Sequence, residues 1–129
     1  MTTKRLAVRN ALVAKVAAVT GLPVRVNLDF ALEDINLPCA VVRSGDDEAD
    51  SPAQTLDGDS GQGVFEVHLL VRGDDPEALA DGYEAPLRAA LLADMTLSGA
   101  AVKVFYRSGG WEFDLGDLVV RKLAFGAWF

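Results

Sequence analysis

Residues 75–94, DPEALADGYEAPLRAALLAD, decide the fold. The stretch begins as helices do, because the Asp75 carboxylate can cap the first turn and Pro76 suits the first helical position. Apolar side chains then recur at helical spacing and predict a single buried stripe. They are Leu79, Tyr83, Leu87, Ala90 and Leu91. The segment is therefore predicted to be an amphipathic helix that covers a sheet.

The other positions of this helix predict its hydrated face and its shape. Asp81, Glu84 and Arg88 fall away from the apolar stripe and are expected to meet water. Pro86 cannot donate to the carbonyl group four residues earlier, which belongs to Gly82. Because an interior proline costs ~3 kcal/mol or more unless the helix bends, we expect a bent helix here.

Patterns on both sides of this helix predict a sheet. Residues 64–72 alternate apolar and polar side chains, which is typical of a half-buried strand. The full set of expected elements is a helix over 3–20, a possible short strand within 24–36, strands over 39–43, 64–72, 101–107 and 118–129, a turn over 108–110 and a possible short strand over 111–113. The order α-β-β-α-β-β indicates an α+β fold, with a mostly antiparallel sheet and the helices packed on one face.

Length and composition limit the class of protein. The chain has 129 residues and is predicted to form one domain, 1–129. Cys39 is the single cysteine, which excludes an internal disulfide bond and fits a reducing compartment. No apolar run approaches the ~20 residues that a membrane span needs, so we expect no membrane partner. The formal net charge of −7 argues against nucleic acid as a main partner, because phosphate contacts need clustered Lys and Arg.

The charged residues are unevenly distributed along the chain. Residues 1–25 hold basic side chains and no acidic one, whereas residues 44–63 hold Asp46, Asp47, Glu48, Asp50, Asp57 and Asp59 and no basic one. The second segment is expected to be a flexible acidic loop. Asp57 and Asp59 resemble the first two ligands of an EF-hand loop, but His68 stands where the bidentate Glu is required. We therefore predict no metal and no other cofactor.

The sequence offers little for catalysis. His68 is the single histidine, and Glu66 on the same strand face could orient it, but no motif links a nucleophile to the pair. An exposed histidine without a role is therefore the favoured interpretation. Cys39 lies in an apolar run, which favours a buried and inert thiol. The sequence also lacks GxSxG, HExxH, CxxC and a glycine-rich phosphate loop, so we predict that the protein is not an enzyme.

The aromatic side chains near the C-terminus have two interpretations. Trp111, Trp128 and Phe129 are large apolar groups on or near strands that can lie at a sheet edge. They either fill the core of the monomer or are carried by the terminal strand into a subunit contact. Trp is enriched among the residues that dominate such contacts.

Four segments together resemble the tail terminator proteins of long-tailed bacteriophages, of the minor tail protein U type. They are the basic N-terminal helix followed by LPCAVV at 37–42, GVFEVHLLV at 63–71 after the acidic loop, LLADMTLSG at 91–99 and DLVVRKLAF at 117–125. These are structural signatures and not catalytic ones. Their order and spacing carry the resemblance, which covers most of the chain.

The resemblance implies a structural assembly protein, located in the virion at the head-proximal end of the tail and assembled in the host cytoplasm. Its partners would be copies of itself in a hexameric ring (with a monomer possible in solution), the tail tube protein, and a head-completion or connector protein. The ring would cap the tail tube, stop its polymerisation and provide the head–tail joining surface. DNA would pass through without specific binding. The alternatives are another neck or tail-completion subunit, or a small α+β ligand-binding domain.

A ring requires head-to-tail contacts between unlike surfaces. We hypothesise that the basic N-terminal segment of one subunit faces the acidic loop of another, or faces the tube. The candidate interface residues are Lys4, Arg5, Arg9, Asp46, Asp47, Glu48, Asp57, Asp59, Trp128 and Phe129.

Overall fold

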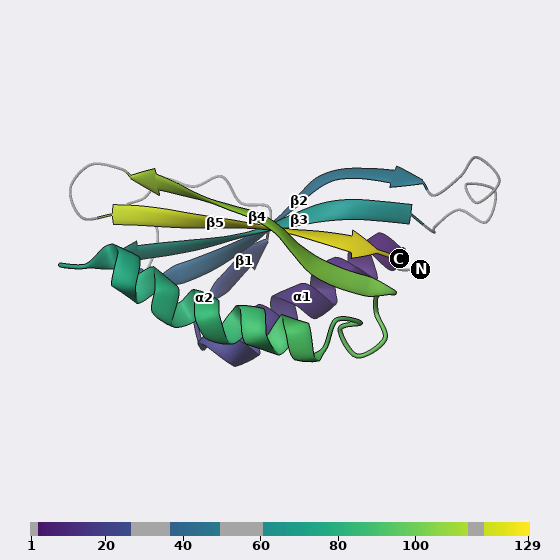
Figure 1. Ribbon diagram of the computed structural model, residues 1–129, viewed down its shortest axis with the longest axis horizontal. Coiled ribbons are helices and arrows are strands. Elements are labelled where there is room, and N and C mark those ends of the chain that lie inside the picture. Colours follow the sequence, from purple (N-terminus) through teal and green to yellow (C-terminus); the bar gives the residue numbers. More distant parts are fainter. Residues whose placement is uncertain (1–2, 27–36, 50–60, 114–117) are drawn as a thin grey trace.

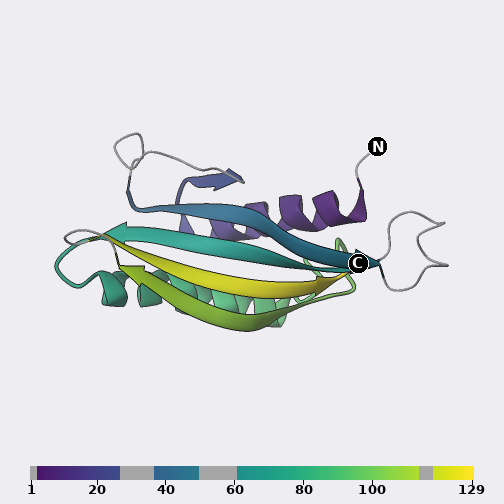
Figure 2. The ribbon, with the colours of Figure 1, turned by 90° about the horizontal axis from the view of Figure 1, so that it is seen from above.

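The computed structural model describes residues 3–26, 37–49, 61–113 and 118–129, with only the backbone described at 46–49. The elements in order are α1 (Lys4–Thr20), β1 (Val24–Val26), β2 (Cys39–Ala49), β3 (Gly61–Arg72), α2 (Pro76–Ala93), β4 (Lys103–Phe113) and β5 (Leu118–Trp128) (Figure 1). The predicted α+β class is confirmed, and both helices lie on one side of the sheet (Figures 1 and 2).

The strands form one sheet of five, in the order β1-β2-β3-β5-β4. β1 pairs parallel to β2, and the other neighbours pair antiparallel. The predicted hairpin of residues 39–43 with 64–72 is present, with Cys39 opposite Leu70 and Val42 opposite Val67. The terminal strand β5 therefore runs between β3 and β4, and β4 is an edge strand (Figure 2).

Helix α1 forms where its end signals predict it. The Thr3 hydroxyl accepts a hydrogen bond from the Leu6 amide at 3.1 Å, which caps the N-terminus. Gly21 closes the C-terminus with φ 70°, a conformation that glycine adopts without steric cost. The buried side chains of the helix are Val8, Leu12 and Val16, which recur at helical spacing. They join one core with the inner face of the sheet and with α2, which includes Val42, Phe65, Val67, Leu69, Leu87, Leu91, Leu123, Phe125 and Ala127.

In the first half of α2, the buried positions are shifted by one residue from the predicted stripe. Its buried residues are Ala80, Glu84, Leu87 and Leu91, whereas Leu79 is exposed. The expectation that Glu84 meets water was wrong, because Arg121 on β5 supplies a partner that lets the carboxylate be buried. The helix continues without interruption through Pro86.

The turn predicted at 108–110 was also wrong. Residues Ser108, Gly109 and Gly110 lie inside β4, opposite β5. The pairing of β4 with β5 shifts register between Tyr106 and Ser108, so the irregular sequence marks a bulge in an edge strand and not a reversal of the chain. The expected strands over 101–107 and 111–113 are therefore one strand.

The acidic segment 44–63 is not a loop over its whole length. β2 continues to Ala49 and β3 begins at Gly61, with Asp47 opposite Gly63 and Glu48 opposite Gln62. Strand β2 thus includes Asp46, Asp47 and Glu48, with Asp46 inside the register shift between Ser44 and Asp47. Residues 50–60 lie outside the described residues. The possible strand within 24–36 is present as β1, and the rest of that segment also lies outside them.

Candidate interaction surface

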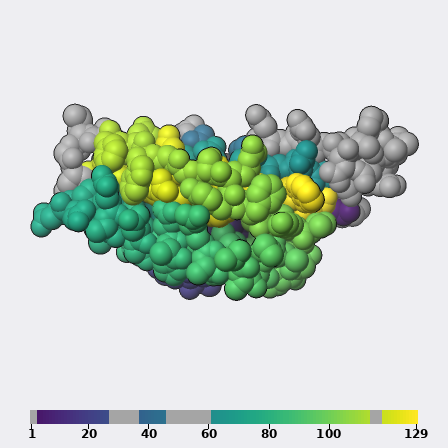
Figure 3. All heavy atoms as spheres, viewed as in Figure 1, coloured from purple at the N-terminus to yellow at the C-terminus, as the bar shows by residue number. Residues whose placement is uncertain are grey.

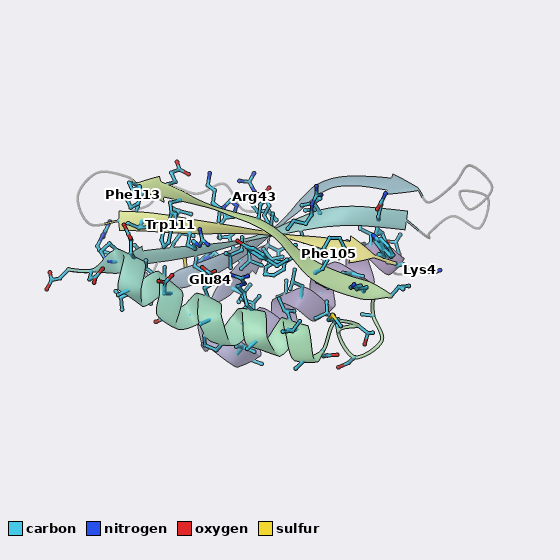
Figure 4. The ribbon with its side chains drawn as sticks, in the orientation of Figure 1. Lys4, Arg43, Glu84, Phe105, Trp111 and Phe113 are labelled. Atoms are coloured by element: carbon cyan, nitrogen blue, oxygen red, sulfur yellow. The ribbon has the colours of Figure 1, made fainter. Side chains whose placement is uncertain are left out.

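A buried ion pair joins Glu84 on α2 to Arg121 on β5. Figure 4 labels Glu84, which lies between the helix and the sheet. The Arg121 Nε atom donates to Glu84 Oε1 at 2.7 Å, and Arg121 Nη2 donates to Glu84 Oε2 at 3.3 Å. Arg88, one helical turn along α2, donates to the same carboxylate at 3.3 Å. Glu84 is 6% exposed, so two cations rather than water surround this charge.

The surroundings of the pair shift the pKa values of both of its groups. Burial alone would raise the pKa of Glu84, but the hydrogen bonds and charges of Arg121 and Arg88 outweigh it, and the pKa of that carboxyl is lowered. The bond to Glu84 likewise raises the pKa of Arg121. Both groups are therefore held in their charged forms.

The same arginines, Arg88 on α2 and Arg121 on β5, also contact residues of the edge strand β4. The Arg121 guanidinium lies 4.6 Å from the centre of the Trp111 ring, and its Nη1 atom donates to the Gly110 carbonyl at 3.3 Å. The Arg88 guanidinium lies 3.9 Å from the centre of the Tyr106 ring. Cations stacked on aromatic faces in this way are attracted by the ring quadrupole. Polar and stacking contacts therefore position β4 against α2.

An apolar groove opens between the C-terminal half of α2 and the first half of β4. It has a volume of ≈ 280 Å³ and is lined by Arg88, Ala89, Leu91, Leu92, Met95, Val104, Phe105, Tyr106 and Phe125. Leu92 on its rim is 74% exposed. Figure 3 shows the face of the molecule on which β4 and α2 lie side by side. Tyr106 packs edge-on against Phe125 at the floor, with 5.8 Å between ring centres.

The other half of β4 is also apolar at its surface. Trp111 and Phe113 stack with 6.1 Å between their ring centres, and Phe113 is 62% exposed. Val102, just before the strand, is exposed as well. We call the set Leu92, Met95, Val102, Trp111 and Phe113 the β4 edge surface. Leu92, Met95 and Val102 lie near the start of β4, and Trp111 and Phe113 lie near its end. Exposed apolar groups of this kind are candidates for contact with a partner.

The face of the sheet away from the helices holds the two residues weighed for chemistry. His68 is buried, not exposed as expected, because its ring lies among neighbouring strands and its Nε2 atom is 3.1 Å from Glu66 Oε1. Cys39 is buried as predicted, and burial raises the pKa of its thiol. Such a thiol is a poor nucleophile at neutral pH. Apart from the Glu66 carboxylate beside His68, no described residue completes a catalytic set with His68 or Cys39.

The structure places the basic and acidic candidates at the same end of the molecule. The Arg5 Nη1 atom donates to the Ser44 hydroxyl at 3.2 Å, just before the acidic part of β2. Arg9 donates to Asn10 within α1 at 3.0 Å. The N-terminus of α1, with Lys4 labelled, lies beside that end of the sheet (Figure 4). Asp57 and Asp59 lie outside the described residues.

The two aromatic candidates at the C-terminus have different environments. Trp128 is 49% exposed and packs edge-on against Phe105, with 6.3 Å between ring centres. Gly126 makes room for that contact, because a Cβ atom there would lie 2.5 Å from the Phe105 ring. Phe129 is buried in the main core, and its backbone exchanges hydrogen bonds with Gly61. Trp128 is therefore available at the surface, and Phe129 belongs to the interior.

Sequence reasoning missed the features that dominate this surface. The Glu84–Arg121 pair joins positions far apart in the chain, so local periodicity could not reveal it. One signal was present, since Glu84 lies three residues before Leu87 and seven before Leu91, on the buried side of the helix. Within the described ranges no cluster of three or more His, Cys, Asp or Glu side chains could hold a metal ion. No helix in the same ranges is long and apolar enough to cross a membrane.

Comparisons with known proteins give distant likenesses to solved structures, including the following two. No family model and no curated protein matches the chain. One solved chain, which carries no functional name, is 23% identical, with 97% of this chain and 93% of that chain covered and a TM-score of 0.48. A chain from the virion of a native gene transfer agent particle is 15% identical, with 93% and 92% covered and a TM-score of 0.47. Neither likeness is close enough to carry an argument about function.

Proposed function

We propose that this protein is a structural assembly protein of a phage-like particle, which forms a ring that caps the tail tube. The class of protein is proposed from the resemblance of four sequence segments to tail terminator proteins. The observation that carries the proposal is the β4 edge surface, whose exposed apolar side chains lie beside a groove at one end of β4 and at the other end of the same strand. Exposed apolar groups beside a groove are suited to contact with another protein.

Capping a tube requires a surface of suitable shape and does not require a chemical reaction. One face of the ring must bind the last tube subunits, and the other must not repeat the surface to which tube subunits add. A ring made by head-to-tail contacts satisfies this requirement, because its two faces differ. The buried His68 and Cys39 take no part in this scheme, so the protein acts without catalysis.

The test is to add the purified protein to the tube subunit of the same particle during polymerisation and to measure tube lengths by electron microscopy. Short tubes whose mean length falls as protein is added would support capping. Unchanged tube lengths at saturating protein would refute it. A variant with His68→Ala provides the control for chemistry: full capping activity is expected, and loss of capping with a folded variant would point to a role for the imidazole.

A further inference from the structure

We propose that the free protein forms a two-fold dimer, in which the outer edges of two β4 strands pair antiparallel with Gly110 on the symmetry axis. The occupant of the β4 edge surface is then a second copy of this chain. The dimer does not depend on the proposed function, because it concerns the protein before it enters a particle. Since it covers β4, the two copies must separate before that surface can contact anything else.

Strand β4 has one open edge. It pairs with β5 along one side, and no other strand in the described part of the chain pairs with it (Figure 2). The Val104 amide donates to the Met95 carbonyl at 2.6 Å, so the edge that remains open covers Tyr106 to Phe113. The N–H and C=O groups that point away from β5 along this edge can pair with another strand.

Apolar exposure is concentrated on this side of the molecule. Among the described residues, the large apolar side chains that are exposed lie, apart from Trp128, on α2, on β4 or on the segment between them. They are Leu79, Leu92, Met95, Val102, Trp111 and Phe113. Contact with a second copy along β4 would remove part of this area from water, which favours association.

The side chains of the open edge divide between the two faces of the sheet. Tyr106, Trp111 and Phe113 lie on the helix side, because their partners on β5 contact α2 or belong to the core beneath it. Glu112 lies on the opposite face, where it pairs with Lys122 at 2.8 Å. Arg107 lies on that face too, since its side chain runs beside the position where a Cβ atom of Gly126 would be.

A second copy turned by a half-turn about Gly110 matches the helix side of the strand. Gly109 of one copy then lies opposite Trp111 of the other, and Tyr106 lies opposite Phe113. Tyr106 lines the apolar groove, so Phe113 of the second copy comes to lie at the mouth of that groove. Aromatic pairs across neighbouring strands stabilise a sheet, and the symmetry makes this pair twice.

The charges on the other face match in the same register. The pairing of β4 with β5 shifts by one residue between Tyr106 and Ser108, so Arg107 and Ser108 together lie opposite one residue. In the dimer that residue is Glu112 of the second copy. Charges on an edge strand ordinarily discourage pairing, but this order of charges is complementary to its own reversal.

Helix α2 carries its charges in the same complementary order. It begins at the end of the sheet where β4 ends (Figure 1). Asp81, in its first half, lies close enough to Arg121 to contribute to the raised pKa of that guanidinium. Arg88, in its second half, stacks on Tyr106 beside the groove. The half-turn therefore brings the acidic half of one α2 towards the basic half of the other.

Cysteine cross-linking of the free protein tests both the pairing and its register. In a Cys39→Ala background, Gly110→Cys places two thiols opposite each other on the axis, where the Cα atoms of paired strands lie about 4.5–5.5 Å apart. A disulfide bond can bridge that distance. A Cβ atom at Gly110 meets nothing within 4 Å, so the substitution should leave the monomer intact. Mild oxidation should give a covalent dimer as the main product.

Ser108→Cys in the same background is the matched control. Ser108 is exposed on the same strand, but in this register it lies opposite Glu112 of the second copy. Its two thiols are therefore four residues apart along the strand, about 13 Å, which a disulfide bond cannot bridge. Gly110→Cys that stays monomeric, or that cross-links no better than Ser108→Cys, would overturn the pairing.

Sedimentation of the unmodified protein provides a second readout. An equilibrium between monomer and dimer is expected, and a monomer at every concentration would overturn the inference. Arg107→Glu should weaken dimerisation by ~5-fold or more, because it places like charges opposite each other twice. Adding Glu112→Arg should restore it. Absence of the dimer in a protein that still shortens tubes would refute this inference alone, whereas a confirmed dimer that fails to shorten tubes would refute only the proposed function.

Discussion

Helices α1 and α2 cover the same face of the sheet, yet they are attached to it differently. α1 buries only apolar side chains, Val8, Leu12 and Val16, and its ends are capped within the same chain. α2 buries Glu84 among its apolar residues and leaves Leu92 largely in water. Besides the shared apolar core, an ion pair links the two helices, where Lys15 Nζ on α1 lies 3.0 Å from Oδ2 of Asp94, the residue that ends α2.

The difference separates a part of the molecule whose large apolar side chains are covered from a part that leaves several of them exposed. The buried side chains of α1 follow the hydrophobic pattern of the sequence, and the helix leaves little apolar surface exposed to water. The α2–β4 side uses an ion pair and cation–aromatic stacking to fix the edge strand, and it keeps apolar groups exposed. We infer that the α1 side stabilises the fold and that the α2–β4 side is the surface that contacts a partner.

The largest loss of stability is expected from Leu12→Ala. Removing a fully buried leucine side chain should lower the free energy of unfolding by about 4 kcal/mol, through lost burial and the cavity left behind. Urea denaturation with an unchanged m-value measures this. Ala18→Ser, at an exposed position of the same helix, serves as the control and should stay within about 0.5 kcal/mol. A loss below about 1 kcal/mol for Leu12→Ala would contradict the tight packing of α1.

Breaking the ion pair should cost nearly as much. Arg121→Met leaves the buried Glu84 carboxylate with Arg88 alone, and we expect a loss of about 3 kcal/mol in the same denaturation experiment. The double variant Glu84→Leu with Arg121→Met should recover most of it, because an apolar pair of similar volume needs no charge partner. If the double variant were less stable than Arg121→Met, the pair would contribute more than an apolar contact can replace.

The pair should also make stability depend on pH. The pKa of Glu84 lies below its ordinary value of 4.5 in the folded protein, so the stability it contributes is present above 4.5 and is lost as pH falls through the folded pKa. The stability difference between native protein and Glu84→Gln should therefore be largest near neutral pH and shrink in acid. Thermal unfolding across the acidic range measures it. A difference that grows on acidification would reverse this assignment.

The smallest effect on the monomer is expected at the groove. Leu92→Ser should change monomer stability by no more than about 0.5 kcal/mol, because the side chain is mostly in water already. The same change should weaken ring assembly, which sedimentation detects. Ala85→Ser, elsewhere on the exposed side of α2, should affect neither property. Unimpaired assembly of Leu92→Ser would exclude the groove from the contact.

The parts of the fold that sequence could predict are those governed by neighbouring residues. Thr3 and Gly21 fix the ends of α1 by local hydrogen bonds, and the alternation in 64–72 identifies β3. Glu84 was misplaced because its burial depends on Arg121 in a different strand. Gly109 and Gly110 were misread as a turn because glycines serve bulged edge strands as well as reversals.

The candidate site was predictable only in outline. The sequence suggested that exposed aromatics near the C-terminus could reach a subunit contact, and Trp128 is at the surface while Phe129 is in the core. The groove beside β4 could not be foreseen, because it is formed by residues of α2, β4 and β5 that meet only after folding.

The most direct test of the central claim is to grow tubes in the presence of gold-labelled protein and to locate the label by electron microscopy. The account predicts label at one end of each terminated tube and none along its wall. Label spread along the walls, or terminated tubes that carry no label, would contradict it.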